Sequence, residues 1–268
     1  MSQKPLQPGF MSPGRFLLAA TLLACTFALG SVSAQTDEIQ VYTGELAAPG
    51  EFTLVWHNNY TPSGIKAPAF PGAVVSHHSY NAVPEWAYGV NDWFEAGLYL
   101  PVYSYDKNGS LGWDSAKLRT LFAVPHAEKR DFFYGVNFEF SFNSHRWDEK
   151  RNTGEIRPII GKRFGRVDVI VNPILDTSFD GLDQLDFAPS ARIDFNANDK
   201  WTVALEHYAD FGPIKNFLPS SQQSHALYGV VDYAGETTGV EFGIGKGLNG
   251  ATDKLTIKLM LSWSLGKK

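Results

Sequence analysis

The chain has 268 residues, of which 44% are hydrophobic and 14% aromatic, and its formal net charge is −5 at pH 7. A mildly acidic chain without basic clusters argues against a nucleic-acid partner. Cys25 is the single cysteine, so no disulfide can form within the chain.

Residues 1–34 have the pattern of a secretory signal peptide. Lys4 and Arg15 give a positive start, residues 16–30 form an apolar run, and small residues at the −3 and −1 positions end at Ala34. The apolar run is shorter than the roughly 20 residues that a membrane helix needs. We therefore expect removal of residues 1–34 by cleavage after Ala34.

Two alternatives at this end of the chain stay open. Met11 is a second candidate start, because residues 11–34 alone have the length of a signal peptide. Leu22-Leu23-Ala24-Cys25 loosely resembles a lipobox, which would place a lipid on Cys25, although the apolar run continues beyond it. Cleavage after Ala34 makes residues 35–50 a periplasmic N-terminal segment and residues 51–268 the folded domain.

Apolar and polar residues alternate with period 2 through most of residues 51–265, which predicts β-strands. The clearest run is 132–143, where Tyr134, Val136 and Phe138 alternate with smaller or polar residues. About twelve strands are expected, as in an even-stranded barrel, at about 51–60, 78–89, 93–103, 113–124, 132–143, 154–164, 167–176, 186–195, 200–210, 224–233, 237–247 and 254–265.

Strand length and loop length both favour a membrane barrel over a soluble sandwich. Soluble strands average about 5–6 residues, whereas strands that span a membrane need about 9–11. Long links such as 61–76 and 211–223 alternate with short ones such as 89–92 and 165–166. Outer-membrane barrels place short turns in the periplasm and long loops outside. The sequence predicts an all-β chain, folded as a closed antiparallel transmembrane β-barrel in the bacterial outer membrane.

Aromatic residues cluster near the predicted strand ends, where amphipathic rings sit at the two membrane–water interfaces. An alternative is that they form the core of a soluble sandwich. The predicted interface aromatics are Trp56, Trp86, Tyr88, Trp93, Trp201 and Trp263.

A closed barrel in lipid turns its apolar residues outward and its polar residues into the lumen. Acidic and basic residues are interspersed on the predicted inner face, where they either pair in a packed lumen or line a water-filled pore. Arg119, Arg157, Arg163 and Glu206 are the first candidates for selectivity. The predicted lumen residues are Glu85, Glu95, Lys117, Arg119, Glu139, Arg157, Arg163, Asp168, Arg192, Asp194 and Glu206.

The sequence predicts a protein without enzymatic activity, cofactor or metal. Glu206 and His207 are adjacent on a strand and therefore point to opposite faces, so they do not form a dyad. A lipid-modifying enzyme is a third hypothesis, and it would draw its base from His57, His126, His145, His207 or His225.

Four stretches resemble outer-membrane barrel proteins of the "MetA-pathway of phenol degradation" family. They are residues 37–42 with 49–52, residues 85–95, residues 172–176 and residues 205–210. The resemblance implies an outer-membrane barrel that passes small hydrophobic or aromatic solutes. The chain departs from many outer-membrane proteins at its C-terminus, which ends in Lys268 and not in an aromatic residue.

The leading hypothesis is a passive channel or facilitator for small solutes. A second hypothesis is a closed structural or surface-binding barrel whose function lies in the loops 61–76 and 211–223. The expected partners are outer-membrane lipid, the barrel-assembly machinery and a small-molecule solute.

Overall fold

The computed structural model describes residues 37–267. The predicted signal peptide, its cleavage point at Ala34 and the lipid site at Cys25 lie outside the described residues. Within residues 37–267, no helix has the length and apolar character needed to cross a membrane.

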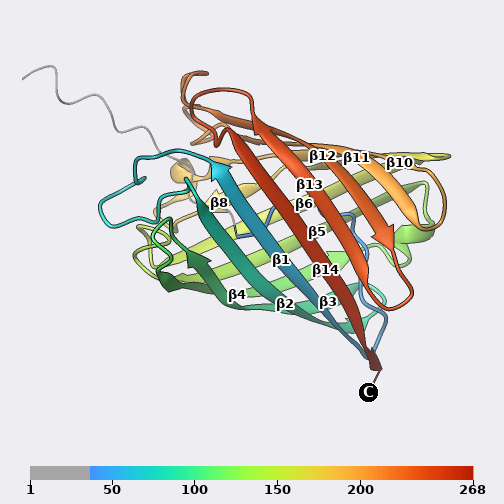
Figure 1. Cartoon of the computed structure of the whole chain (residues 1–268). Coiled ribbons are helices and arrows are strands. Elements are labelled where there is room, and N and C mark those ends of the chain that lie inside the picture. The colour runs from blue at the N-terminus through green and yellow to red at the C-terminus, as the bar shows by residue number, and fades with distance from the viewer. Residues whose placement is uncertain (1–36, 268) are drawn as a thin grey trace, which may run out of the picture. The chain divides into compact units, whose positions relative to one another are not determined.

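The described chain is built almost wholly of antiparallel strands (Figure 1). Short 3-10 helices lie at Ala127–Lys129 and Leu182–Gln184. The strands are β1 (Glu51–Ser63), β2 (Ser79–Asn91), β3 (Phe94–Tyr105), β4 (Leu111–Ala123), β5 (Phe132–Asn143), β6 (Asn152–Phe164), β7 (Val167–Asn172), β8 (Leu175–Thr177), β9 (Asp186–Phe187), β10 (Ser190–Asn196), β11 (Trp201–Asp210), β12 (Ser224–Ala234), β13 (Gly239–Gly247) and β14 (Leu255–Lys267).

Most strands pair with the next strand along the chain, and the sheet closes on itself. β1 pairs with β14, and the additional pairing of β5 with β6 closes the sheet into a ring. β7 and β8 both pair with β6 and together take one position in the wall, while β9 continues the position of β10. The fourteen strand pieces therefore make the closed twelve-stranded barrel that the sequence predicts.

Prolines explain why two predicted strands are each broken in two. The sequence predicts continuous strands at 167–176 and 186–195, but β7 stops before Pro173 and β10 starts after Pro189. Proline has no backbone N–H to donate to a neighbouring strand, so it interrupts the ladder at these points.

Apolar side chains face outward and charged side chains face inward. On the outer face Leu118, Ile193 and Leu205 are 54%, 52% and 55% exposed, whereas Arg119 and Glu206, which follow Leu118 and Leu205, are 4% and 0% exposed. Such an arrangement is the reverse of a water-soluble protein and matches a wall in contact with lipid. Closure also gives the edge strands partners, as the interior of a membrane requires.

Exposed aromatic rings gather near both ends of the barrel. We call the end with the short β2–β3, β6–β7 and β10–β11 links the turn end, and the opposite end the loop end. Trp93 lies in a link at the turn end beside Phe122, and Trp201 lies there beside Tyr233. At the loop end, Tyr80 contacts the rings of its neighbours Tyr103 and Tyr105 on β3.

The other predicted interface aromatics divide into two groups. Tyr88 packs on Phe52 at the turn end, and Trp263 pairs with Leu54 close by. Trp56 and Trp86 also face outward, but Trp56 lies midway along β1 because that strand continues to Ser63. The predicted interface position of Trp56 therefore moves into the middle of the wall.

Candidate functional site

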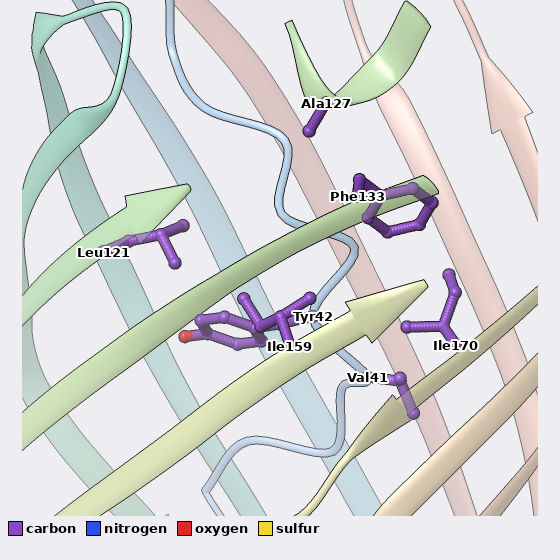
Figure 2. Packing of buried hydrophobic residues seen from close by; sticks show 7 residues of the cluster. All are labelled: Val41, Tyr42, Leu121, Ala127, Phe133, Ile159 and Ile170. Atoms are coloured by element: carbon purple, nitrogen blue, oxygen red, sulfur yellow. The ribbon is translucent and has the colours of Figure 1, made fainter. Parts of the chain in front are cut away.

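Residues 37–50, which we call the N-terminal segment, run through the inside of the barrel before entering β1. The sequence predicts a periplasmic position for residues 35–50, but the described part contacts inward-facing wall residues. Val41 and Tyr42 are buried in a cluster formed by β4 to β7 and the β4–β5 link (Figure 2). The wall members of this cluster are Leu121, Ala127, Phe133, Ile159 and Ile170.

The wall binds the backbone of the N-terminal segment. The Asn172 side chain accepts a hydrogen bond from the Tyr42 N–H at 2.7 Å and donates one to the Tyr42 carbonyl at 3.1 Å. Lys258 donates to the Ile39 carbonyl at 3.0 Å, and Asn59 donates to the Asp37 carbonyl at 2.8 Å. These contacts supply the buried segment with partners that it lacks within its own chain stretch.

The two acidic side chains at the start of the segment pair with basic residues of the wall. Lys117 Nζ lies 2.8 Å from Asp37 Oδ1, and Arg157 Nη1 lies 3.2 Å from Glu38 Oε1. Arg157 also holds Glu155 of the wall at 2.7 Å. The segment therefore adds two acidic partners for the basic residues of this part of the lumen.

The Tyr42 ring lies among charged groups of β3 to β6. Its hydroxyl is 2.6 Å from the Tyr99 hydroxyl and donates to Glu139 at 3.4 Å. The Arg157 and Arg119 guanidinium carbons lie 4.4 Å and 5.7 Å from the ring centroid. Both distances fall within the range of cation–π attraction.

Further ion pairs line the same side of the lumen toward the turn end. Arg119 pairs with Glu85 at 2.9 Å and with Glu95, and His57 lies 2.9 Å from Glu85. Glu95 also accepts a hydrogen bond from the Ala47 N–H at 2.6 Å. We call the set on β2 to β6 the segment-binding wall; it comprises Glu85, Glu95, Tyr99, Lys117, Arg119, Glu139, Glu155 and Arg157.

The strands on the other side carry a self-contained ion cluster. Arg192 pairs with Asp194, Glu206, Asp232 and Glu241. Lys258 is fully buried and pairs with Glu206 and Glu241, each at 2.5 Å. We call these six residues, on β10 to β14, the self-paired wall.

A loop side chain covers the lumen from the loop end. Trp147, in the β5–β6 loop, is buried against inward-facing Val83, Tyr99 and Val102. Tyr99 thus contacts both this tryptophan and the Tyr42 hydroxyl. The neighbouring Arg146 lies 3.4 Å from Asp114 on β4 and accepts a hydrogen bond from the Val74 N–H, which ties the loop down.

Comparison with solved structures identifies the architecture. An outer-membrane channel of Pseudomonas putida F1, the COG4313 channel, aligns with a TM-score of 0.57 and 11% identity over 85% of this chain and all of that chain. The KdgM porin in complex with disordered oligogalacturonate and the NanC porin each align at 0.52 and 8% identity, over 80% of this chain and 99% of theirs. The chain has the fold of an outer-membrane β-barrel.

This fold and the apolar outer face are consistent with location in the bacterial outer membrane. No protein-family model matches the chain, and none of the curated proteins matches it. The resemblance to the phenol-degradation family therefore stays a prediction beyond the outer-membrane barrel fold itself.

Every predicted lumen residue lies on the inner face and takes part in an ion pair, including Arg163 with Asp168 at 3.4 Å near the turn end. The sequence did not predict that the N-terminal segment lies inside the barrel or that Asn172 binds its backbone. The predicted set of lumen residues also left out five wall residues that strand alternation places on the inner face; they are His57, Glu155, Asp232, Glu241 and Lys258.

The histidines proposed for a lipid-modifying site do not gather in one place. His57 is buried in the lumen beside Glu85, whereas His207 and His225 stack on each other on the outer face, with ring centroids 5.5 Å apart. His126 adjoins the short helix of the β4–β5 link, and His145 lies in the β5–β6 loop beside Phe70. Such dispersal gives the enzyme hypothesis no common base and orienting group.

Proposed function

We propose that the chain is a passive outer-membrane channel for small solutes, closed in the described conformation by its N-terminal segment. The observation that carries this proposal is how the segment binds to the wall. Polar side chains of the wall hold it through ion pairs and hydrogen bonds. Residues 37–46 of the segment form no β-ladder with the wall. Contacts of this kind can exchange with water when the segment leaves.

The barrel size agrees with a conducting lumen once the segment is gone. Barrels of about eight strands are filled by their own side chains, and those of sixteen or more leave an open channel. A twelve-stranded barrel lies between these two sizes, so we propose that the N-terminal segment inside it decides whether the lumen conducts. The porins and the channel with the same fold support passive transport, although each is at most 11% identical to this chain.

The charges of the lumen set the expected solute class. The carboxylates of both walls outnumber their basic partners, as in the four acids that share Arg192 and Lys258. Bare hydrocarbons gain little in such surroundings, and anions are repelled. We propose that uncharged solutes with a polar group, aromatic ones included, pass the open channel.

Planar-bilayer recording tests the proposal with two chains. The full chain should conduct rarely, and a variant lacking residues 37–46 should conduct roughly tenfold more often or more, since each charged hydrogen bond of the segment is worth about 1.5–3 kcal/mol. Heat-modifiable gel mobility verifies that both chains fold. A variant lacking the exposed residues 181–184 of the β8–β9 link serves as the deletion control and should behave as the full chain.

One observation favours a second function, that of a closed structural barrel. The ion pairs of the self-paired wall form without the segment, and Trp147 covers the loop end. A closed barrel predicts no conductance above bare lipid for the folded deletion variant as well. That result would reject the channel and leave the loops 61–76 and 211–223 as the functional parts.

A further inference from the structure

We propose that the place held by the Tyr42 side chain is a binding site for hydroxylated aromatic solutes, in which the N-terminal segment inserts its own phenol as a built-in competitor. The inference deepens the proposed channel function, because a solute reaches this place through the lumen.

The groups around Tyr42 match both parts of a phenol, its ring and its hydroxyl. Arg157 and Arg119 lie near the ring, at 4.4 Å and 5.7 Å from its centroid. Tyr99 supplies a hydroxyl at 2.6 Å, and Glu139 supplies a carboxylate oxygen at 3.4 Å. A phenolic hydroxyl that donates to Glu139 can accept from Tyr99, so both of its hydrogen-bonding roles are met.

The wall groups are held in place without help from Tyr42. Glu139 Oε1 accepts a hydrogen bond from the Asn137 side chain at 3.0 Å, and Glu139 Oε2 lies 3.6 Å from Lys117. Arg157 is fixed by Glu155 through two hydrogen bonds of 2.7 Å and 2.8 Å. A site that is preorganised in this way costs a ligand little in ordering the wall.

The chemistry of these groups selects among aromatic compounds. A hydrocarbon such as toluene would leave the Tyr99 hydroxyl and Glu139 without the partner that Tyr42 now supplies, and buried polar groups without partners are costly. An aromatic acid would bring a negative charge beside Glu139, where Arg157 and Arg119 are already paired with carboxylates of the wall. A phenol is neutral at pH 7, since its pKa is near 10, so it avoids both penalties.

The position of the site fits a competitor in a transport path. Tyr99 joins the Tyr42 hydroxyl on one side to the buried Trp147 of the loop end on the other. If a solute enters along this side from the loop end, Tyr99 is the wall residue that lies between that entry and the Tyr42 place. Binding there requires Tyr42 to leave, so solute binding and segment release are linked.

The test uses Tyr42→Ala in the full chain, with 4-methylphenol as the probe. Removing the ring leaves a space of phenol size, and engineered cavities of ring size bind aromatic molecules. Calorimetry in detergent should show 4-methylphenol binding to Tyr42→Ala roughly tenfold or more tighter than toluene, because the hydroxyl regains hydrogen bonds to a charged group. The wild-type chain should bind neither probe measurably.

Two control variants separate the site from a general loosening of the segment. Tyr42→Phe keeps the ring in place and should bind neither probe. Val41→Ala weakens the packing of the segment but leaves Tyr42 where it is, so it should also bind neither. Heat-modifiable mobility establishes that each variant is folded before binding is measured.

The outcomes distinguish this inference from the channel proposal. Folded Tyr42→Ala that binds 4-methylphenol and toluene equally, or binds neither up to their solubility, overturns the phenol site. Selective binding by a chain that never conducts, even without residues 37–46, keeps the site and rejects the channel. Conductance without selective binding of 4-methylphenol keeps the channel and rejects the phenol site.

Discussion

The two charged walls of the lumen contain similar residues but use them differently. On the self-paired wall, Arg192 and Lys258 find their carboxylate partners on neighbouring strands of the same wall. On the segment-binding wall, Lys117 and Arg157 complete their pairing with Asp37 and Glu38 of the N-terminal segment. The ion pairs of the first wall therefore lie within that wall, with the Ile39 carbonyl as one further acceptor for Lys258, whereas two cations of the second wall also pair with carboxylates of the segment.

The difference separates structural charges from functional ones. Buried ions are costly unless they are paired, so the self-paired wall must keep all its members for the barrel to stay folded. The segment-binding wall can trade one set of partners for another, such as water or a solute. We therefore expect substitutions on the first wall to lower stability, and loss of the contacts between the second wall and the N-terminal segment to change gating.

The largest effect is expected for Arg192→Ala. It removes the cation shared by four carboxylates and leaves Asp194 and Asp232 without a cation, while Glu206 and Glu241 keep Lys258. Loss of one partner from a buried ion pair costs about 3–5 kcal/mol. Urea unfolding of the barrel in lipid vesicles measures the loss, and an unchanged free energy of unfolding would break the distinction between the walls.

Next comes the double substitution Asp37→Asn with Glu38→Gln. It removes both charges by which the segment binds Lys117 and Arg157 but keeps its length and shape. The open fraction in bilayer recordings should rise at least roughly tenfold, since charge-assisted hydrogen bonds are worth about 1.5–3 kcal/mol.

Glu155→Gln is the matched control for that double variant. Glu155 binds the same Arg157 but belongs to the wall, so its loss should lower stability without raising the open fraction. An open fraction raised equally by Glu155→Gln and by the segment substitutions would show that charge loss alone, and not release of the segment, opens the lumen.

A smaller effect concerns the charge preference of the open lumen. In the variant without residues 37–46, potassium should pass more readily than chloride, by a factor on the order of a few, because acidic groups dominate a confined lumen. Reversal potentials in a potassium chloride gradient give this ratio. Glu241→Gln should reduce the ratio, and an anion-selective pore would contradict the charge assignment.

The smallest effect is expected outside both walls, at Asp106 in the β3–β4 loop. Hydrogen bonds from the Ser110 and Asn108 backbone N–H groups, 2.9 Å and 2.8 Å long, lower the pKa of Asp106. A lowered pKa in the folded state gives stability above the unfolded value near 3.9, which is lost as the pH falls through the folded value.

Asp106→Ala should therefore lower the free energy of unfolding by less than about 1 kcal/mol at pH 7, as for an exposed hydrogen-bonded carboxylate. The difference from wild type should shrink at low pH. Gating should not change, since this loop contacts neither wall. An altered open fraction would mean that the loops contribute to closure.

Alternation in the sequence predicts the barrel well because lipid and lumen impose opposite polarity on successive residues. The run 132–143 shows this directly, since β5 begins and ends where the predicted strand does. The same alternation predicts Arg119, Arg192 and Glu206 on the inner face. Pro173 and Pro189 were visible in the sequence as well, and they mark where the two predicted strands break.

The pairing partners could not be read from the sequence. Asp37 and Lys117 are 80 residues apart, and Tyr42 and Asn172 are 130 apart, so their contact depends on the closure of the whole wall. Residues 38–41 alternate between polar and apolar over only four residues, which does not predict their place inside the barrel. Two acids at the start of this stretch fit a lumen only when the basic groups of β4 and β6 are already in position.

Adding back the segment as a separate peptide tests most directly whether it closes the lumen. The peptide has the sequence of residues 37–46, and it is applied to the variant that lacks them, with a scrambled peptide as control. We predict that the native peptide restores the closed state of single channels in proportion to its concentration and that the scrambled peptide does not. A variant that conducts no more than the full chain, or that ignores the native peptide, would contradict closure by the N-terminal segment.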